Sequence, residues 1–146
     1  MAQRFLCRFA LPEAAPREQE LVVHASGSEA GLQLALRCAA FEGRVVEASW
    51  FGDSTPTLPL GEAFHSRRLR LIGSQVGAVG GTMRGRRTHA ERLATALDLL
   101  ADTAYDLLLD GPTSFDALPD AMSRILRTGG LCQVIEYARD CAADEG

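Results

Sequence analysis

Short apolar runs alternate with an amphipathic segment in the first part of the chain. Residues 21–25 (LVVHA) form one such run, residues 44–51 (RVVEASWF) form another, and apolar positions recur at helical spacing from Leu32 to Ala40 between them. A short apolar run predicts a strand covered on both faces, and the helical period predicts a helix between the two strands. Because about a dozen helical residues lie between the two runs, we expect parallel strands joined by a right-handed crossover.

The sequence also marks both ends of this first helix. Ser26 and Glu29 form a Ser-x-x-Glu capping box, which predicts that the helix begins directly after Ser26. Gly43 stands where a left-handed residue commonly ends a helix, so the helix is expected to stop near Phe41 or Glu42.

The rest of the chain continues the alternation of strands and helices. Residues 1–20 are weakly patterned. The elements expected after residue 51 are a short helix at 61–66, a strand at 69–76, a helix opened by the Thr88–Glu91 capping box, a strand at 105–109, a helix at 119–126 and a strand at 131–137. This order predicts an α/β fold, a partial Rossmann-like parallel sheet (its second half) with two packed helices and a short C-terminal α+β extension.

The composition excludes several kinds of chemistry. All 15 basic residues are arginine, so a Schiff-base lysine, a P-loop lysine and a Ser-Lys dyad are excluded. The four cysteines and three histidines are scattered without a C-x-x-C, and we expect no zinc site in this chain. The sequence contains no signal peptide and no apolar run long enough for a membrane span, which predicts a cytoplasmic protein without a membrane partner.

Positive charge is concentrated in one segment of an otherwise acidic chain. The net charge is −4, yet residues 67–92 contain seven arginines against one acid, a local balance of +6. No aromatic residues are interleaved with these arginines, so no nucleic-acid partner is expected. We expect this segment to be a solvated loop or to pair with the acid-rich segment after Asp98.

Two catalytic motifs are incomplete. No glycine precedes Gly27, so a G-x-G-x-x-G that would bring the backbone close to a pyrophosphate is missing from this chain. Ser26 lies in His-Ala-Ser-Gly, and His24 occupies the position where a G-x-S-x-G nucleophile elbow needs glycine, so that motif is rejected. His24, His65 and His89 have no spaced cysteine or carboxylate partner in the sequence and are interpreted as structural.

Four segments in order resemble the zinc-type medium-chain dehydrogenase/reductase family, the relatives of alcohol and sorbitol dehydrogenases. They are VVHASGSEAGLQLALRCAAFEGRVVEASWFGD, LPLGEAFHSRRLRLIGSQVG, RLATALDLLAD and SFDALPDAMSRIL, and the similarity extends from about Phe9 to Tyr137. The resemblance covers only the second half of the Rossmann domain and the return into the catalytic domain. It implies a partial dinucleotide-binding domain at 1–101, a return segment at 102–138 and a tail at 139–146.

The resemblance also implies a cofactor and the residues that face it. NAD or NADP would lie at the carboxyl ends of the strands. Residues expected near the adenosine half are Ala25, Ser26 and Gly27, and those expected near the nicotinamide are Ser49, Trp50, Gly73, Ser74 and Gln75. Two of these positions have a structural alternative, because Ser26 is also explained as a helix cap and Trp50 as a core or interface residue.

Several functions remain open at this point. The resemblance implies an NAD(P)-dependent alcohol oxidoreductase that acts on a small alcohol or carbonyl substrate, but this chain lacks the family's zinc ligands and is expected to be a truncated part without catalytic competence of its own. No catalytic residue is assigned. The first alternative is a non-catalytic dimerisation or binding module that uses an exposed sheet edge and associates with itself or with a partner supplying the missing half. The other two are a methyltransferase fragment and a disrupted gene product.

Overall fold

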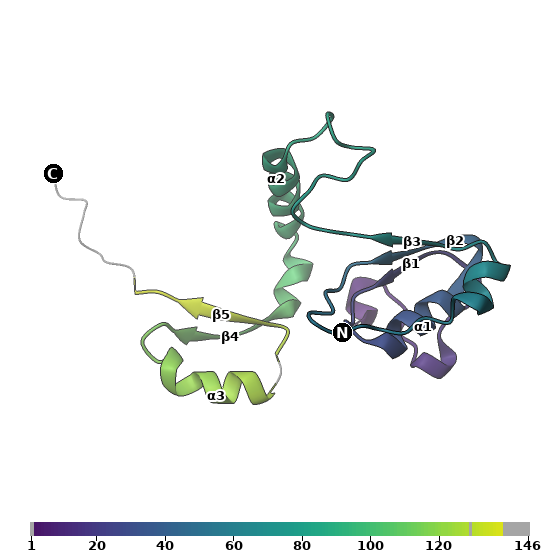
Figure 1. Cartoon of the computed structure of the whole chain (residues 1–146). Coiled ribbons are helices and arrows are strands. Elements are labelled where there is room, and N and C mark those ends of the chain that lie inside the picture. The colour runs from purple at the N-terminus through teal and green to yellow at the C-terminus, as the bar shows by residue number, and fades with distance from the viewer. Residues whose placement is uncertain (1, 129, 139–146) are drawn as a thin grey trace. The chain divides into compact units, whose positions relative to one another are not determined.

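The structure, a computed structural model, describes residues 2–128 and 130–138 and falls into two units (Figure 1). One unit comprises residues 8–92, and the other comprises residues 1–7 together with 93–146. The expected domain limits at 101 and 138 remain a prediction, and the expected tail at 139–146 lies outside the described residues. Among those described, no helix is long and apolar enough to cross a membrane.

The unit of residues 8–92 is built on three parallel strands. They are β1 (Gln19–His24), β2 (Ala39–Glu47) and β3 (Arg70–Gly73), arranged in the order β1-β2-β3. Helix α1 (Glu29–Cys38) connects β1 to β2. The parallel crossover expected from the apolar runs is therefore confirmed, and with it the α/β fold class.

Both predicted ends of α1 are wrong. The N-cap is Ser28, whose Oγ accepts a hydrogen bond from the Gly31 amide at 3.1 Å, and the helix begins at Glu29. Ser26 is not the cap because its hydroxyl binds His24, and the Glu29 carboxylate instead accepts a hydrogen bond from the Thr57 amide at 2.8 Å.

The carboxyl end of α1 comes earlier than expected because the chain enters β2 directly after Cys38. A bulge follows, in which Leu21 of β1 pairs with Arg44 while Gln19 pairs with Ala39. The left-handed residue is Glu42, with φ of 58°, and not Gly43. Gly43 is needed for a different reason, since a Cβ there would lie 2.9 Å from the Ala40 carbonyl oxygen.

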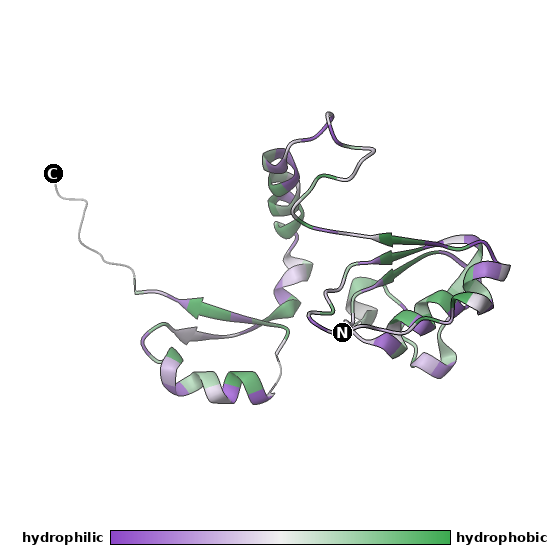
Figure 2. Cartoon of the chain, viewed as in Figure 1, coloured by the Kyte–Doolittle hydropathy of each residue, from purple (hydrophilic) through white to green (hydrophobic). Residues whose placement is uncertain are grey.

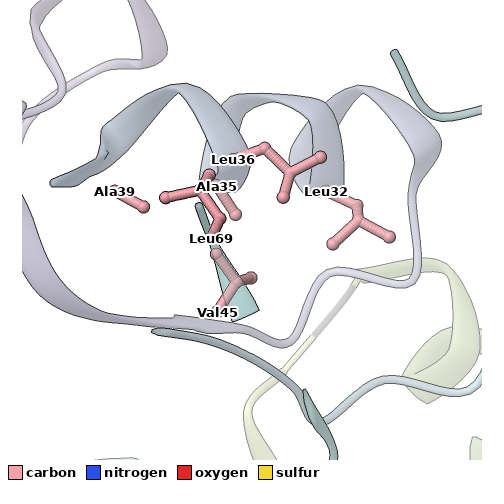
Figure 3. Packing of buried hydrophobic residues seen from close by; sticks show 6 residues of the cluster. All are labelled: Leu32, Ala35, Leu36, Ala39, Val45 and Leu69. Carbon is pink, nitrogen blue, oxygen red and sulfur yellow. The ribbon is translucent and has the colours of Figure 1, made fainter. Parts of the chain in front are cut away.

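The core of this unit lies between α1 and one face of the sheet. Figure 3 shows the leucine and alanine side chains of α1 on the side of the helix that faces Val45 of β2. The buried apolar cluster consists of Leu32, Ala35, Leu36, Ala39, Val45 and Leu69. Its residues recur at helical spacing in α1, so the periodicity in the sequence did mark the buried face.

The opposite face of the sheet is apolar and exposed. Leu21 and Val23 of β1 are 50% and 61% exposed, and Ile72 of β3 is 42% exposed. Figure 2 colours these strands mainly green, as hydrophobic segments. The expectation that the first strand is covered on both faces is thus wrong for the described residues.

The second helix expected to pack on the sheet is α2 (His89–Leu100), and none of its residues is buried. Its predicted capping box is confirmed, because the Thr88 amide donates to Glu91 Oε2 at 2.7 Å and the Glu91 amide donates to Thr88 Oγ1 at 3.2 Å. The start of the helix is therefore fixed by its own cap, and its packing on the sheet remains a prediction.

Three predictions in the middle of the chain need adjustment. The second strand ends at Glu47 and the third at Gly73, both earlier than predicted. The expected short helix at 61–66 is present as a kinked helical segment, η3 (Leu60–Phe64). In the N-terminal region, short 3-10 helices η1 (Ala2–Phe5) and η2 (Pro12–Ala14) occur.

The other unit contains a small strand-helix-strand arrangement. Strands β4 (Leu109–Ser114) and β5 (Cys132–Glu136) are parallel, and α3 (Leu118–Thr128) lies between them in sequence. The helix and the last strand match the prediction. The predicted strand at 105–109 is wrong, because Asp102 caps a 3-10 helix, η4 (Thr103–Leu108), through the Ala104 amide at 2.9 Å.

Candidate functional site

The carboxyl ends of the three parallel strands meet at one edge of the sheet. The last residues of β1, β2 and β3 are in register, with His24 opposite Glu47 and Glu47 opposite Gly73. The ladder continues one residue further on each side, because the Ala48 amide donates to the His24 carbonyl and the Ser74 amide donates to the Glu47 carbonyl, both at 2.8 Å. Ligands of open α/β sheets bind at this edge.

Four side chains form a continuous hydrogen-bonded chain at this edge. Glu47 Oε2 lies 2.6 Å from His24 Nδ1, and His24 Nε2 lies 2.7 Å from Ser26 Oγ. Ser26 Oγ in turn lies 2.9 Å from Ser28 Oγ. The chain runs from a half-buried carboxylate on β2, through a histidine on β1, to two serines before α1. We call Glu47, His24, Ser26 and Ser28 the polar relay.

Burial and a second contact fix the histidine and the carboxylate of the relay. His24 is 5% exposed, and its ring stacks on Phe51 with centroids 6.1 Å apart. Ser49 supports Glu47 through its amide, which donates to Oε1 at 2.6 Å. Burial raises the pKa of Glu47, but hydrogen bonds from Ser49 and His24 outweigh it, so the pKa lies below its ordinary value and the carboxylate is ionised at neutral pH.

Two glycines let the backbone come close to this edge. A Cβ on Gly31 would lie 2.3 Å from Ser26 Oγ and 2.8 Å from His24 Nε2, so the first turn of α1 lies directly against the relay. Gly27 has a φ of 61°, and a Cβ there would lie 3.5 Å from the Trp50 carbonyl oxygen. The loops that follow β1 and β2 therefore contact each other.

The structure brings together some of the predicted site residues. Ser26 belongs to the polar relay, and Ser49 contacts the relay because its Oγ lies 3.3 Å from His24 Nδ1. Trp50 is 88% exposed and lies beyond the end of β2, so it is not a core residue. Ala25, like Gly27, is exposed on the loop after β1.

The predicted residues at the end of β3 line a depression to which no relay residue contributes. Gly73, Ser74 and Gln75 line a separate depression of about 710 Å³, together with Arg84 and Arg92. Arg92 is engaged with the local backbone, since its guanidinium donates to the carbonyl oxygens of Val76 at 2.6 Å and Ala78 at 3.3 Å. The eight predicted residues therefore fall into two groups along the same sheet edge.

Two arginines of the arginine-rich segment form ion pairs within their own unit, and the pairing expected with the segment after Asp98 remains a prediction. Arg67 forms an ion pair with Glu18 at 2.6 Å, and Arg68 with Glu42 at 3.3 Å. The acidic partners of these two arginines thus come from the segment before β1 and from the bulge of β2. Both acids have a positive φ, so local backbone geometry that the sequence does not reveal presents them to the arginines.

Sequence reasoning missed two members of the relay and misread a third. His24 was interpreted as a structural residue without a carboxylate partner, Glu47 was not considered, and Ser28 was not assigned as the cap. The signal was available, because His24 and Glu47 each end one of two adjacent parallel strands. Only the register shows that the two side chains meet.

The described part of the chain contains no group of three His, Cys, Asp or Glu side chains arranged as metal ligands. No protein-family model matches the chain, and no curated protein matches it.

Solved structures do match. L-idonate 5-dehydrogenase of Escherichia coli K-12 superposes with a TM-score of 0.61 at 17% identity, over 88% of this chain and 33% of that protein. Benzyl alcohol dehydrogenase of Acinetobacter calcoaceticus gives 0.58 at 15% identity, over 84% and 32%. This chain has a dehydrogenase-type fold. An alcohol dehydrogenase of Escherichia coli CFT073, complexed with NADH, gives 0.57 at 16% identity, over 81% and 32%. The chain thus spans about a third of the length of these proteins.

The side chains at this sheet edge can be compared with what a dinucleotide needs. Gly73 leaves open space at the sheet edge, because an added Cβ there would meet nothing within 4 Å. Such a space suits a ring, and the hydroxyls of Ser26 and Ser49 suit a ribose. The described residues before β1 contain no glycine, so the glycine-rich turn that binds a pyrophosphate is not among them. The fit is therefore to half of a cofactor site.

Proposed function

We propose that this chain is the C-terminal part of an NAD(P)-dependent alcohol-dehydrogenase-type oxidoreductase and that the carboxyl edge of its sheet forms one wall of the dinucleotide cleft. The observation that carries the proposal is the meeting of three parallel strand ends, His24, Glu47 and Gly73, at one edge. Binding at such an edge is the rule for open α/β sheets. The solved dehydrogenases with this fold, one of which holds NADH, support the same assignment.

Within this wall, each group of residues has a proposed position. Ala25, Ser26 and Gly27 would face the adenosine half, where a serine hydroxyl can hydrogen-bond a ribose. Ser49, Trp50, Gly73, Ser74 and Gln75 would face the nicotinamide. The cofactor supplies the hydride chemistry when it is bound, and this chain supplies hydrogen-bond partners and an open surface along the strand ends.

Catalysis requires more than this wall. Hydride transfer needs the nicotinamide and the substrate held in near-attack geometry and a group that polarises the substrate oxygen. We propose that a second polypeptide segment, paired beside β1, completes the cleft. Strand β1 is an edge of the three-stranded sheet, and an edge strand offers its backbone groups for such pairing. The exposed apolar face with Leu21 and Val23 would be covered by the rest of the same segment.

A titration with NADH and NADPH tests the proposal. Trp50 is the only tryptophan and is exposed beside the proposed cleft, so energy transfer from Trp50 to the reduced nicotinamide reports binding. We expect saturable quenching of Trp50. Gly73→Val should weaken it by filling the open position at the edge, while Gly61→Val, also in open space but on η3, should leave it unchanged. Folded chain that gives no saturable signal, with or without a dehydrogenase catalytic segment added, contradicts the proposal.

A second candidate is a non-catalytic assembly module. Strand β3 forms one edge of the sheet, and every residue from Arg70 to Gly73 is exposed. An exposed edge strand is a template for pairing with another strand. Sedimentation at increasing concentration separates the two candidates, since self-association without nucleotide binding favours the module.

A further inference from the structure

The polar relay has the connectivity of a serine nucleophile with its general base. His24 Nε2 lies 2.7 Å from Ser26 Oγ, and His24 Nδ1 lies 2.6 Å from Glu47 Oε2. Such a triad is recognised by geometry and roles and not by sequence order, which is why the missing G-x-S-x-G does not exclude it. We propose that Ser26 is an activated nucleophile and that this unit cleaves small, activated carboxylic esters through an acyl-serine intermediate.

Each member of the relay is in the state that this role requires. The hydrogen bonds from Ser49 keep Glu47 ionised, so Glu47 accepts a hydrogen bond from the Nδ1–H group of His24. The neutral imidazole then has Nε2 as its acceptor. The Ser26 hydroxyl then donates to Nε2. Ser28 donates to Ser26 Oγ, and the Gly31 amide donates to Ser28 Oγ, so the donors point along the relay in one direction.

The base of the relay is buried, while its serine is exposed. His24 is 5% exposed, the Glu47 side chain is 15% exposed, and Ser26 is exposed to solvent. A buried imidazole stacked on Phe51 is held in one orientation, while the hydroxyl at its end is open to a substrate. This is the distribution expected of a positioned base behind an accessible nucleophile.

A groove adjoins the serine. Ser26 and Ser28 line a space of about 620 Å³ whose other walls are η2 and the exposed side of α1, including Ala30 and Leu34. Arg17 and Arg37 also line it, against a single acid, Glu13. The apolar wall suits a short alkyl or aryl group, and the excess of guanidinium groups favours a substrate with an anionic substituent.

The reaction balances without a further reactant. Ser26 Oγ attacks the ester carbonyl as His24 Nε2 takes the hydroxyl proton, and the carbon–oxygen bond to the alcohol breaks as His24 returns that proton to the leaving oxygen. Water, deprotonated by His24, then attacks the acyl carbon; the bond to Ser26 Oγ breaks as His24 returns the proton to that oxygen, and the carboxylic acid leaves. The first turn of α1, which Gly31 brings against Ser26 Oγ, is where negative charge on the intermediate would be stabilised.

Covalent labelling tests the nucleophile directly. An alkyl fluorophosphonate transfers its phosphonyl group to an activated serine with loss of fluoride, and peptide mass spectrometry locates the label. We expect the label on Ser26, with the rate in His24→Gln lowered by about 10²- to 10⁴-fold. Ser54→Ala removes an exposed loop serine away from the relay and should change nothing.

Hydrolysis of p-nitrophenyl acetate gives the second readout. Wild-type protein should release nitrophenol above the buffer rate, and Ser26→Ala should return it to that rate, while circular dichroism checks that the variant remains folded. A label that avoids Ser26 in the wild-type protein overturns the proposal even if His24→Gln fails to fold. Neither result bears on nucleotide binding, which the Trp50 titration measures separately.

Discussion

Replacing Gly31 by alanine should destabilise the unit of residues 8–92, although alanine is the better helix former. Gly31 lies in the first turn of α1, and an added Cβ would be 2.3 Å from Ser26 Oγ, 2.8 Å from His24 Nε2 and 2.9 Å from Ser28 Oγ. Real Cβ atoms do not approach other atoms so closely. The short Ser26 side chain must therefore rotate away, and its hydrogen bonds to His24 and Ser28 break.

The size of the effect follows from three contributions. Alanine gains up to about 1 kcal/mol of helix propensity over glycine. Losing the Ser26–Ser28 hydrogen bond costs about 1 kcal/mol, and leaving the buried His24 Nε2 without its partner costs about 1–3 kcal/mol. We therefore expect Gly31→Ala to lower the free energy of unfolding by about 1–3 kcal/mol.

Urea denaturation followed by far-UV circular dichroism measures this difference. Gly61→Ala is the matched control, since a Cβ there meets nothing within 4 Å, and its effect should be within about 0.5 kcal/mol. In a Ser26→Ala background, Gly31→Ala should cost less than in the wild type, because the nearest clashing atom is gone. A Gly31→Ala protein as stable as the wild type would refute the reasoning about the relay.

Three further predictions concern other parts of the molecule. Because the pKa of Glu47 is lowered in the folded protein, its contribution to stability is present at neutral pH and is lost as the pH falls through the lowered value; Glu47→Gln should flatten this part of a pH–stability curve. Leu36→Ala should cost about 2–5 kcal/mol in urea denaturation, because Leu36 is 2% exposed, while Leu126→Ala, at a site 76% exposed, should cost less than about 0.5 kcal/mol. Thr88→Ala should weaken the start of α2 by about 1 kcal/mol, visible as faster amide exchange in its first turn.

The sequence was sufficient for the strand-helix-strand order and the buried side of α1. Apolar residues at period 3.6 identify Leu32, Ala35 and Leu36 as one face, and the crossover rule then makes the flanking strands parallel. These features depend on local pattern and on topology. Both are encoded within a short stretch of chain.

The candidate site was less accessible to prediction, because it depends on register. His24 and Glu47 are 23 residues apart, and each lies in an apolar run where a polar residue has no local explanation. The bulge of β2 sets the register, and it depends on the close backbone approach at Gly43. Ser26 was predicted to be a site residue and also a helix cap. Ser26 and Ser28 are separated by one glycine, and their spacing alone does not show which of them caps α1 and which binds His24.

Strand β2 is the middle of the three-stranded sheet, and every interstrand hydrogen bond of that sheet includes it. Strands β1 and β3 have no ladder with each other, so the sheet contains no redundant connection. Disorder in β2 would release both neighbours together, whereas fraying of β3 would leave the β1–β2 pair and α1 intact. The unit should therefore open in a hierarchy, with the β2 amides at Val45 and Val46 exchanging last and the β3 amides well before them.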